Sequence, residues 1–228
     1  TVDGQDSQWT VNGNLYIGER GTGIVEINNA GKLTGSGASI FLGTQSTGDG
    51  TLTLDGADSQ LDFEGELFPG YSGKGKAAVK NGAQFTTGNL TLGFLENSEG
   101  KLDVTNISSF KTTGDLVVGR EGRGELNVSV FGKLTSEGNV VFGEYASSGT
   151  PENANAALVS GFGAEWKVTG DMTVGKQGVG LITVQDQGKL TDEQASLAKV
   201  FCTLRTRDIV SHARELFGGN GILIENDI

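Results

Sequence analysis

The side chains best suited to catalysis are few and scattered in this sequence. His212 is the sole histidine and Cys202 the sole cysteine, so residues 1–191 can assemble neither a Ser–His–Asp triad nor a metal site based on histidine or cysteine. The best carboxylate pair is Asp62 and Glu64, two residues apart and therefore on one face of a strand. Paired carboxylates can cleave glycosidic bonds, but two outward carboxylates are more often a solvated surface. We predict no catalytic residue, no metal site and no cofactor.

Two glycine-rich patterns that could bind ions also fall short. The Gly-Gly-x-Gly-x-Asp nonapeptide of calcium-binding solenoids does not recur in the chain. Residues 73–76 read Gly-Lys-Gly-Lys, a run that is too loose for a phosphate loop and precedes no helix.

The overall charge narrows the possible partners. The chain has 28 acidic and 17 basic residues, a net charge of −11. Because an acidic surface repels nucleic-acid phosphates and anionic lipid, we expect neither as a general partner. No apolar run is long enough to span a bilayer, so we expect no membrane insertion of this segment. No signal peptide opens the sequence, so an exported protein would contain these residues as a mature or excised piece.

A repeat of about 25 residues organises most of the chain. Its first element is Gly-x-apolar-x-apolar-Gly, and an apolar residue stands three positions before each closing glycine. The closing glycines are Gly18, Gly43, Gly70, Gly93, Gly119, Gly143 and Gly175. The apolar residues before them are Leu15, Ile40, Leu67, Leu90, Leu116, Val140 and Met172.

Two more short strands follow in each repeat. The second has an alternating apolar pair: Val25/Ile27, Leu52/Leu54, Ala77/Val79, Leu102/Val104, Leu126/Val128, Ala157/Val159 and Ile182/Val184. The third has one large apolar residue: Leu33, Leu61, Phe85, Phe110, Leu134, Trp166 and Leu190, with Trp9 at the start of the series. Alternation with a period of two predicts strands with one buried face.

Three strands per repeat, with glycine at the corners, predict one coil of a solenoid. A β-sandwich or antiparallel barrel is the alternative, because those folds also have short strands at 8–12-residue spacing. A sandwich does not require the self-similarity, which therefore favours stacked coils with parallel pairing. We predict an all-β fold, a parallel β-helix of about seven coils over residues 1–191, with a C-terminal helical cap.

The repeats resemble a known family. Residues 165–175 (EWKVTGDMTVG), and residues 124–128 followed by 132–135, are similar to the Gly-rich repeats of autotransporter passengers, large surface proteins of Gram-negative bacteria that include adhesins. The resemblance implies a right-handed β-helix that is exported through a C-terminal membrane barrel and is secreted or held at the cell surface. It also implies a host or bacterial cell-surface protein or glycan as partner. Neither the barrel nor an export signal is present, so we expect a fragment of such a passenger.

One repeat contains an insertion. Residues 144–155 are longer than their counterparts and include Pro151, so we expect them to bulge as a loop from one corner. Loops on solenoids often have binding functions. Glu144, Tyr145, Pro151 and Glu152 are therefore the candidate interaction residues, with a tolerated surface insertion as the alternative.

The glycine pattern stops at Thr191, and residues 192–228 form a second predicted region. Apolar residues recur there at helical spacing, Thr191 with Gln194 resembles a capping box, and Gly218 suits a helix C-terminus. We predict a helix over residues 192–217 that covers the open end of the solenoid.

The second region also resembles a different family. Residues 194–201 and 207–222 are similar to the C-terminal helical domain of acyl-CoA dehydrogenases, and the glutaryl-CoA branch is the nearest. That resemblance would place a flavin-contacting turn on residues 218–221. The family's catalytic carboxylate would fall beyond residue 228, and its strand domain is missing, so we expect no flavin.

Three functional hypotheses follow. The chain is a non-catalytic adhesin or host-interaction module, a carbohydrate-active β-helix enzyme, or a fusion with a non-functional acyl-CoA dehydrogenase remnant. The repeats favour the first hypothesis.

Overall fold

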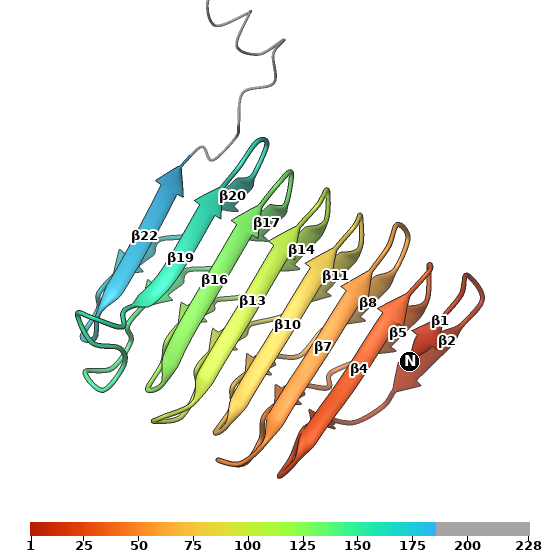
Figure 1. Ribbon diagram of the computed structural model, residues 1–228, viewed down its shortest axis with the longest axis horizontal. Coiled ribbons are helices and arrows are strands. Elements are labelled where there is room, and N and C mark those ends of the chain that lie inside the picture. The colour runs from red at the N-terminus through yellow and green to blue at the C-terminus, as the bar shows by residue number, and fades with distance from the viewer. Residues whose placement is uncertain (186–228) are drawn as a thin grey trace, which may run out of the picture. The chain divides into compact units, whose positions relative to one another are not determined.

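The computed structural model describes residues 1–185. These residues form 22 strands in one repeating order, sheet A, sheet B, sheet C. The chain completes seven coils and begins an eighth with β22 (Figure 1). The predicted parallel solenoid is therefore confirmed. The predicted helical cap, the boundary at residue 191, Leu190, His212 and Cys202 lie outside the described residues.

Each sheet consists of equivalent strands from successive coils. Sheet A contains β1 (Val2–Asp3), β4 (Thr22–Asn28), β7 (Asp49–Asp55), β10 (Lys74–Lys80), β13 (Glu99–Thr105), β16 (Arg123–Ser129), β19 (Asn155–Ser160) and β22 (Gly180–Gln185). Sheet B contains β2 (Gln8–Val11), β5 (Lys32–Gly35), β8 (Gln60–Phe63), β11 (Gln84–Thr87), β14 (Ser109–Thr112), β17 (Lys133–Ser136) and β20 (Glu165–Val168). Sheet C contains β3 (Leu15–Ile17), β6 (Ile40–Leu42), β9 (Leu67–Pro69), β12 (Leu90–Leu92), β15 (Leu116–Val118), β18 (Val140–Phe142) and β21 (Met172–Val174).

The pairing is parallel throughout these sheets, which excludes the sandwich and the antiparallel barrel. The apolar ladder predicted in sheet C is in register from Leu15 to Met172. The ladder predicted in sheet B runs in register from Trp9 to Trp166. The repeat in the sequence therefore predicted both the strands and their partners.

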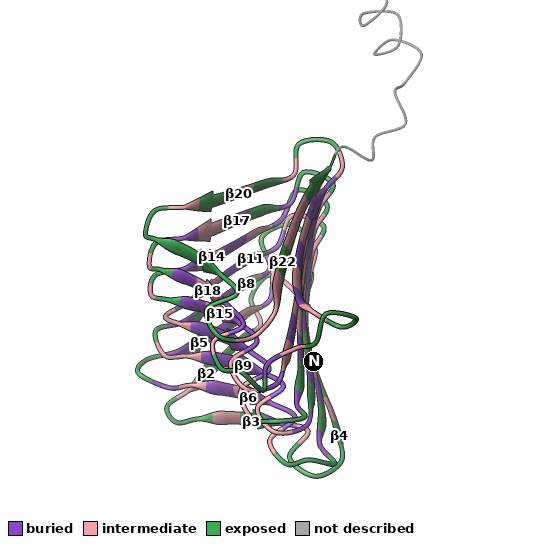
Figure 2. Cartoon of the chain, turned by 90° about the vertical axis from the view of Figure 1, so that its left-hand side faces the viewer, coloured by how far each residue is buried: buried purple, intermediate pink, exposed green. Residues whose placement is uncertain are grey.

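The core is a narrow column between the three sheets. Figure 2 shows buried residues gathered in the strands of the middle coils and exposed residues in many of the turns. In the middle coils the inward side chains are fully buried, as for Leu90, Leu102 and Leu116, each with 0% of its surface exposed. Met172 in the seventh coil is 42% exposed. Burial is thus most complete in the middle coils.

The closing glycines have a backbone conformation that other residues rarely adopt. All seven have a positive φ, between 60° and 76°, a region that is costly for residues with a Cβ. The next coil also passes close to the first six of them. A Cβ added to Gly93 would lie 2.4 Å from the carbonyl oxygen of Arg123. Glycine is required here by both the backbone angle and the neighbouring backbone.

Alanine substitutions can separate these two requirements. Gly93→Ala combines a positive φ with a backbone clash, and we expect it to lower the free energy of unfolding by about 2–4 kcal/mol. Gly37 has a φ of 62° but no atom within 4 Å of an added Cβ, so Gly37→Ala should cost only about 1–2 kcal/mol.

Gly13→Ala is the control, because Gly13 has neither constraint. Urea denaturation followed by circular dichroism measures all three variants. Equal losses for Gly93→Ala and Gly13→Ala would contradict the proposed role of the corner glycines.

Candidate functional site at the insertion corner

The corner between sheets C and A has turns of alternating length. The turns after β3, β6, β9, β12 and β15 contain four, six, four, six and four residues. The turn after β18 contains twelve residues, and the turn after β21 contains five. The insertion therefore occupies a position where the alternation already places a long turn.

The predicted interaction residues fall into two groups on this loop. Pro151 and Glu152 are exposed at its tip, between Thr150 and Asn153, whose backbones pair in both directions at 3.2 and 3.0 Å. Glu144 and Tyr145 lie at its base, next to Arg120. The insertion forms a loop as predicted, but Asn155 is the first residue of β19 and lies outside this loop.

Asn155 anchors the loop from a position where most other coils have glycine. It pairs in register with Gly180 of β22 and is fully buried. Its Oδ1 accepts a hydrogen bond from the Gly124 amide at 2.8 Å, and its Nδ2 donates to Ser148 Oγ at 2.7 Å. Ser148, also fully buried, donates in turn to the Gly122 carbonyl at 2.9 Å. These bonds attach the base of the loop to the preceding coil.

The base of the loop is further held by Arg120. The Arg120 guanidinium lies 4.3 Å from the centre of the Phe94 ring and 5.2 Å from that of Tyr145. Arg120 also contacts Glu121 at 2.8 Å and Glu144 at 3.8 Å. Cation–π contacts of this kind contribute about 0.5–1 kcal/mol at exposed sites. Glu144 and Tyr145 thus belong to a cluster that joins successive coils.

The cluster continues into an aromatic strip along the outside of sheet C. Phe94 stacks on Tyr71 with ring centres 4.8 Å apart, and three more rings form a stack in the first three coils: Tyr16, Phe41 and Phe68. In these stacked pairs the ring faces cover one another. A sugar that stacks on an aromatic ring needs a free face, so we interpret the strip chiefly as a structural ladder.

Sequence reasoning missed this strip, although a signal for it exists. Tyr71, Phe94 and Arg120 each stand one residue after a closing glycine. Aligning the repeats on the closing glycines would therefore have placed them next to one another. The inward apolar pattern alone assigns no role to these outward residues.

A polar hollow lies beside the loop and follows from the turn lengths. The short turn after β15 is recessed between the six-residue turn after β12 and the insertion. The resulting notch has a volume of about 260 Å³ and is lined by residues 96–99 and 121–123, Ser147, Gly149, Thr150 and Asn153. The notch is the concave surface that accompanies the predicted interaction loop.

A second hollow, of about 170 Å³, adjoins the notch on the outer face of sheet A and shares Glu99 and Arg123 with it. Lys101 pairs there with Glu125 at 2.6 Å. Burial raises the pKa of Glu125, but hydrogen bonds from Lys101 and Asn127 and the charges of Lys101 and Arg123 outweigh it, so the pKa lies below its ordinary value. Burial lowers the pKa of Lys101, but its hydrogen bond to Glu125 and the charge of Asp103 outweigh burial. The pKa of Lys101 therefore lies above its ordinary value. The charges on this face largely satisfy one another.

The carboxylate pair Asp62 and Glu64 lies elsewhere, on the outside of sheet B. Both line a hollow of about 200 Å³ with Thr10, Asn12, Thr34, Gly35 and Ser36. Ser36 Oγ donates a hydrogen bond to Glu64 at 3.3 Å. The lining contains no basic side chain. Within residues 1–185, no three acidic, histidine or cysteine side chains gather in a metal-binding group, and no helix is long and apolar enough to cross a bilayer.

The fold defines the class of protein as a parallel β-solenoid with one elaborated corner. Two curated proteins are similar to it in sequence. The Adhesin BmaC autotransporter of Brucella suis biovar 1 (strain 1330) is 37% identical over 125 residues, which cover 52% of this chain and 4% of that protein. The Uncharacterized protein YuaQ of Escherichia coli (strain K12) is 34% identical over 89 residues, 36% of this chain and 6% of that protein.

The chain therefore spans only a small part of either relative. No protein-family model matches the chain, and no solved structure matches it. Neither relative is named as an acyl-CoA dehydrogenase, so the resemblance of the C-terminal region to that family gains no support.

The hydrogen bonds of Asn155 predict the effect of removing its side chain. Asn155→Ala leaves the buried Gly124 amide without its acceptor, and we expect a loss of about 2–3 kcal/mol of unfolding free energy. We also expect faster cleavage after Glu152 by a glutamyl endopeptidase. Asn153→Ala is the matched control, because that side chain is exposed in the same loop. Unchanged cleavage of Asn155→Ala would show that the loop is held in another way.

The Glu125 carboxylate predicts a pH dependence. A carboxyl group whose pKa is lower in the folded than in the unfolded protein stabilises the fold at pH values above its unfolded pKa, which is 4.5 for Glu125. This stabilisation is lost as the pH falls through the lower pKa of the folded state. Glu125→Gln should therefore flatten the fall in stability between about pH 5 and pH 3. Chemical denaturation at several pH values measures this. Glu26→Gln, on the same outer face without an ion pair in the described part of the chain, is the control; equal flattening by both variants would refute the assignment.

Proposed function

We propose that this chain is a segment of a secreted or surface-displayed autotransporter passenger and acts as a non-catalytic adhesin module. The observation that carries the proposal is the 37% identity with the Adhesin BmaC autotransporter over 125 residues. The stacked coils support it, because the resemblance of the repeats to passenger repeats implies this fold.

The architecture suits adhesion for a physical reason. The inward ladders alone form the core, so the outward positions are free to vary without loss of folding. The insertion loop and the notch beside it combine a projecting tip with a polar hollow. We propose this corner as the contact for a host or bacterial cell-surface protein or glycan.

The geometry gives less support to an enzyme. The Asp62–Glu64 hollow has carboxylates but no basic side chain in its lining. The solenoid fold and the name of the adhesin relative are consistent with a protein that binds and does not catalyse. A carbohydrate-active enzyme therefore serves as an alternative outcome of the test.

Beads coated with the full chain test the proposal on cultured host cells and on bacteria. We expect the beads to bind one of these surfaces and the soluble chain to compete. Pro151→Ser with Glu152→Ser should reduce binding severalfold if the loop tip is the contact. The control is Glu19→Ser with Arg20→Ser, two exposed residues at the same corner in the first coil.

Absence of binding to every surface tested would refute the adhesin assignment. Release of sugars from a glycan panel by the chain, abolished by Asp62→Asn, would replace it with the enzyme alternative. Binding that is lost equally in the loop variant and the control would preserve adhesion but reject the loop as its site.

A further inference from the structure

The corner between sheets A and B has turns that place a strong demand on the backbone. In four coils the tip consists of two residues that both have a positive φ: Asn29–Ala30, Asn81–Gly82, Asn106–Ile107 and Val130–Phe131. Two-residue turns with this pair of conformations strongly prefer Asn-Gly. Asn81–Gly82 meets the preference fully, and Val130–Phe131 departs from it most.

Neither the backbone nor the core explains the apolar residues at these tips. A positive φ is an outlier for a β-branched or bulky side chain. Burial does not compensate, since Ile107 is 76% exposed, Val130 46% and Phe131 43%. Phe162, at the tip of the next turn, is 55% exposed. At the equivalent turns of other coils, polar residues and glycine form the same tip, so the fold does not require apolar residues there.

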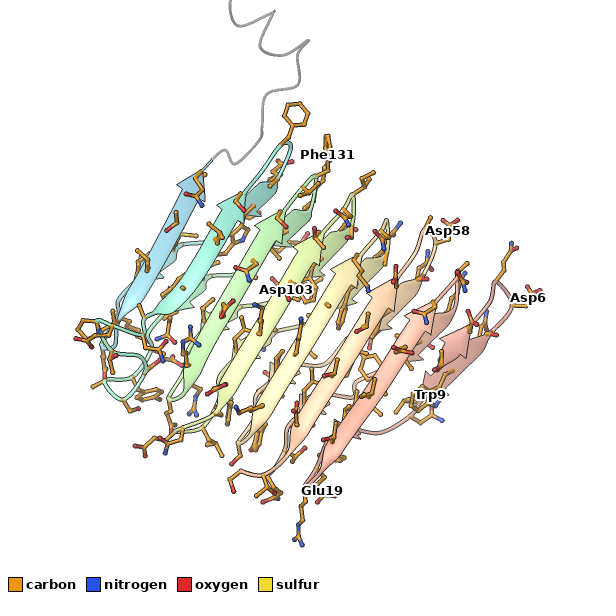
Figure 3. All side chains as sticks on the ribbon, viewed as in Figure 1. Asp6, Trp9, Glu19, Asp58, Asp103 and Phe131 are labelled. Atoms are coloured by element: carbon orange, nitrogen blue, oxygen red, sulfur yellow. The ribbon has the colours of Figure 1, made fainter. Side chains whose placement is uncertain are left out.

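The apolar tips occupy three consecutive turns of this corner, whereas the four earlier turns have polar or small tips. The turns of the first and third coils present Asp6 and Asp58, whereas residues 105–109, 129–133 and 160–164 contain no carboxylate. Figure 3 shows Asp6, Asp58 and Phe131 along one edge of the solenoid. The turns of the second and fourth coils, residues 29–31 and 81–83, also lack carboxylates, so the large apolar side chains themselves distinguish the last three turns.

The tips lie side by side in a row. The Phe131 amide donates to the Phe162 carbonyl at 2.9 Å, and the two rings meet edge to face with centres 5.2 Å apart. The Ile107 amide donates to the Val130 carbonyl at 3.3 Å. We call Ile107, Val130, Phe131 and Phe162 the apolar edge. Since these residues project from three successive turns, they form a convex ridge and not a groove.

Basic side chains flank the ridge on the outer face of sheet B. Lys133 follows Phe131 by two residues, and Lys167 follows Phe162 by five. Both are exposed, and within residues 1–185 neither forms an ion pair. Glu165 is the register partner of Lys133, so the flank is only weakly cationic. The apolar side chains therefore determine the character of this surface more than the two lysines do.

We propose that the apolar edge binds the headgroup surface of a phospholipid bilayer through its three turn tips, a local exception to the expectation from the net charge that lipid is not a general partner. A straight convex row can touch a plane at all its tips at once, whereas a protein partner would need a complementary groove. Apolar side chains beside lysines are the composition of interfacial membrane contacts. The acidic remainder of the solenoid stays outside the bilayer. This contact is additional to the proposed adhesin function, which concerns a protein or glycan at the opposite corner of the strands of sheet A.

Sedimentation of the full chain with large phosphatidylcholine vesicles tests the proposal. We expect measurable binding that increases moderately when phosphatidylserine is included. The edge variant combines Ile107→Gly, Val130→Asn and Phe131→Gly, which gives two turns the Asn-Gly sequence already present in the fourth coil. Its binding should fall about tenfold or more while its melting temperature stays equal or rises, because Asn-Gly suits the turn.

Two controls separate the apolar and electrostatic parts. Ile24→Asn removes an exposed isoleucine, 63% accessible, from the outer face of sheet A and should leave binding unchanged. Lys133→Gln with Lys167→Gln should remove only the additional binding caused by phosphatidylserine. Vesicles without protein or glycan make the result independent of the adhesin assay.

The proposal is overturned if the unchanged chain fails to sediment with either vesicle. It is also overturned if the edge variant binds as well as the unchanged chain, or if Ile24→Asn reduces binding equally. Self-association in analytical ultracentrifugation that depends on the edge, without vesicle binding, would instead assign the ridge to a second copy of the chain.

Discussion

The close contact of backbone with backbone at the corners between sheets C and A is the constraint on which the solenoid depends. At Gly23, an added Cβ would lie 2.2 Å from the Gly18 nitrogen, and the closing glycines must also hold a positive φ. A coil can therefore turn only where glycine, or a residue fitted as specifically as Asn155, is present. This spacing fixes the register, and the register in turn aligns the inward residues into ladders.

Because the corners and ladders determine the fold, the outward positions are left to other forces. The outer face of sheet A has paired charges such as Lys101 and Glu125, and the outside of sheet C has stacked rings. The corner between sheets A and B has polar or small tips in the first four coils and large apolar tips in the next three. One backbone thus presents several different surfaces, which is what an interaction module requires.

The sequence was sufficient for the inward half of this structure and insufficient for the outward half. Inward residues recur at a fixed distance from a closing glycine, so the sequence alone pairs Leu90 with Leu116. Outward contacts such as Arg120 with Phe94 join residues 26 positions apart and involve different residue types in each coil. The length of the insertion was visible, but its anchor was not, since an asparagine in a glycine position looks like an interruption of the pattern.

A repeat protein contains its own reference for what each position requires. Ile24 is exposed on a strand, where a β-branched residue suits the backbone, so its exposure alone indicates little. Val130 and Phe131 are exposed where the backbone disfavours them, and Asn81–Gly82 shows which residues the same turn accepts without conflict. A residue that costs stability and gains no burial is best explained by a contact outside the chain. Comparing equivalent positions therefore separates residues required by the fold from those that are candidates for function.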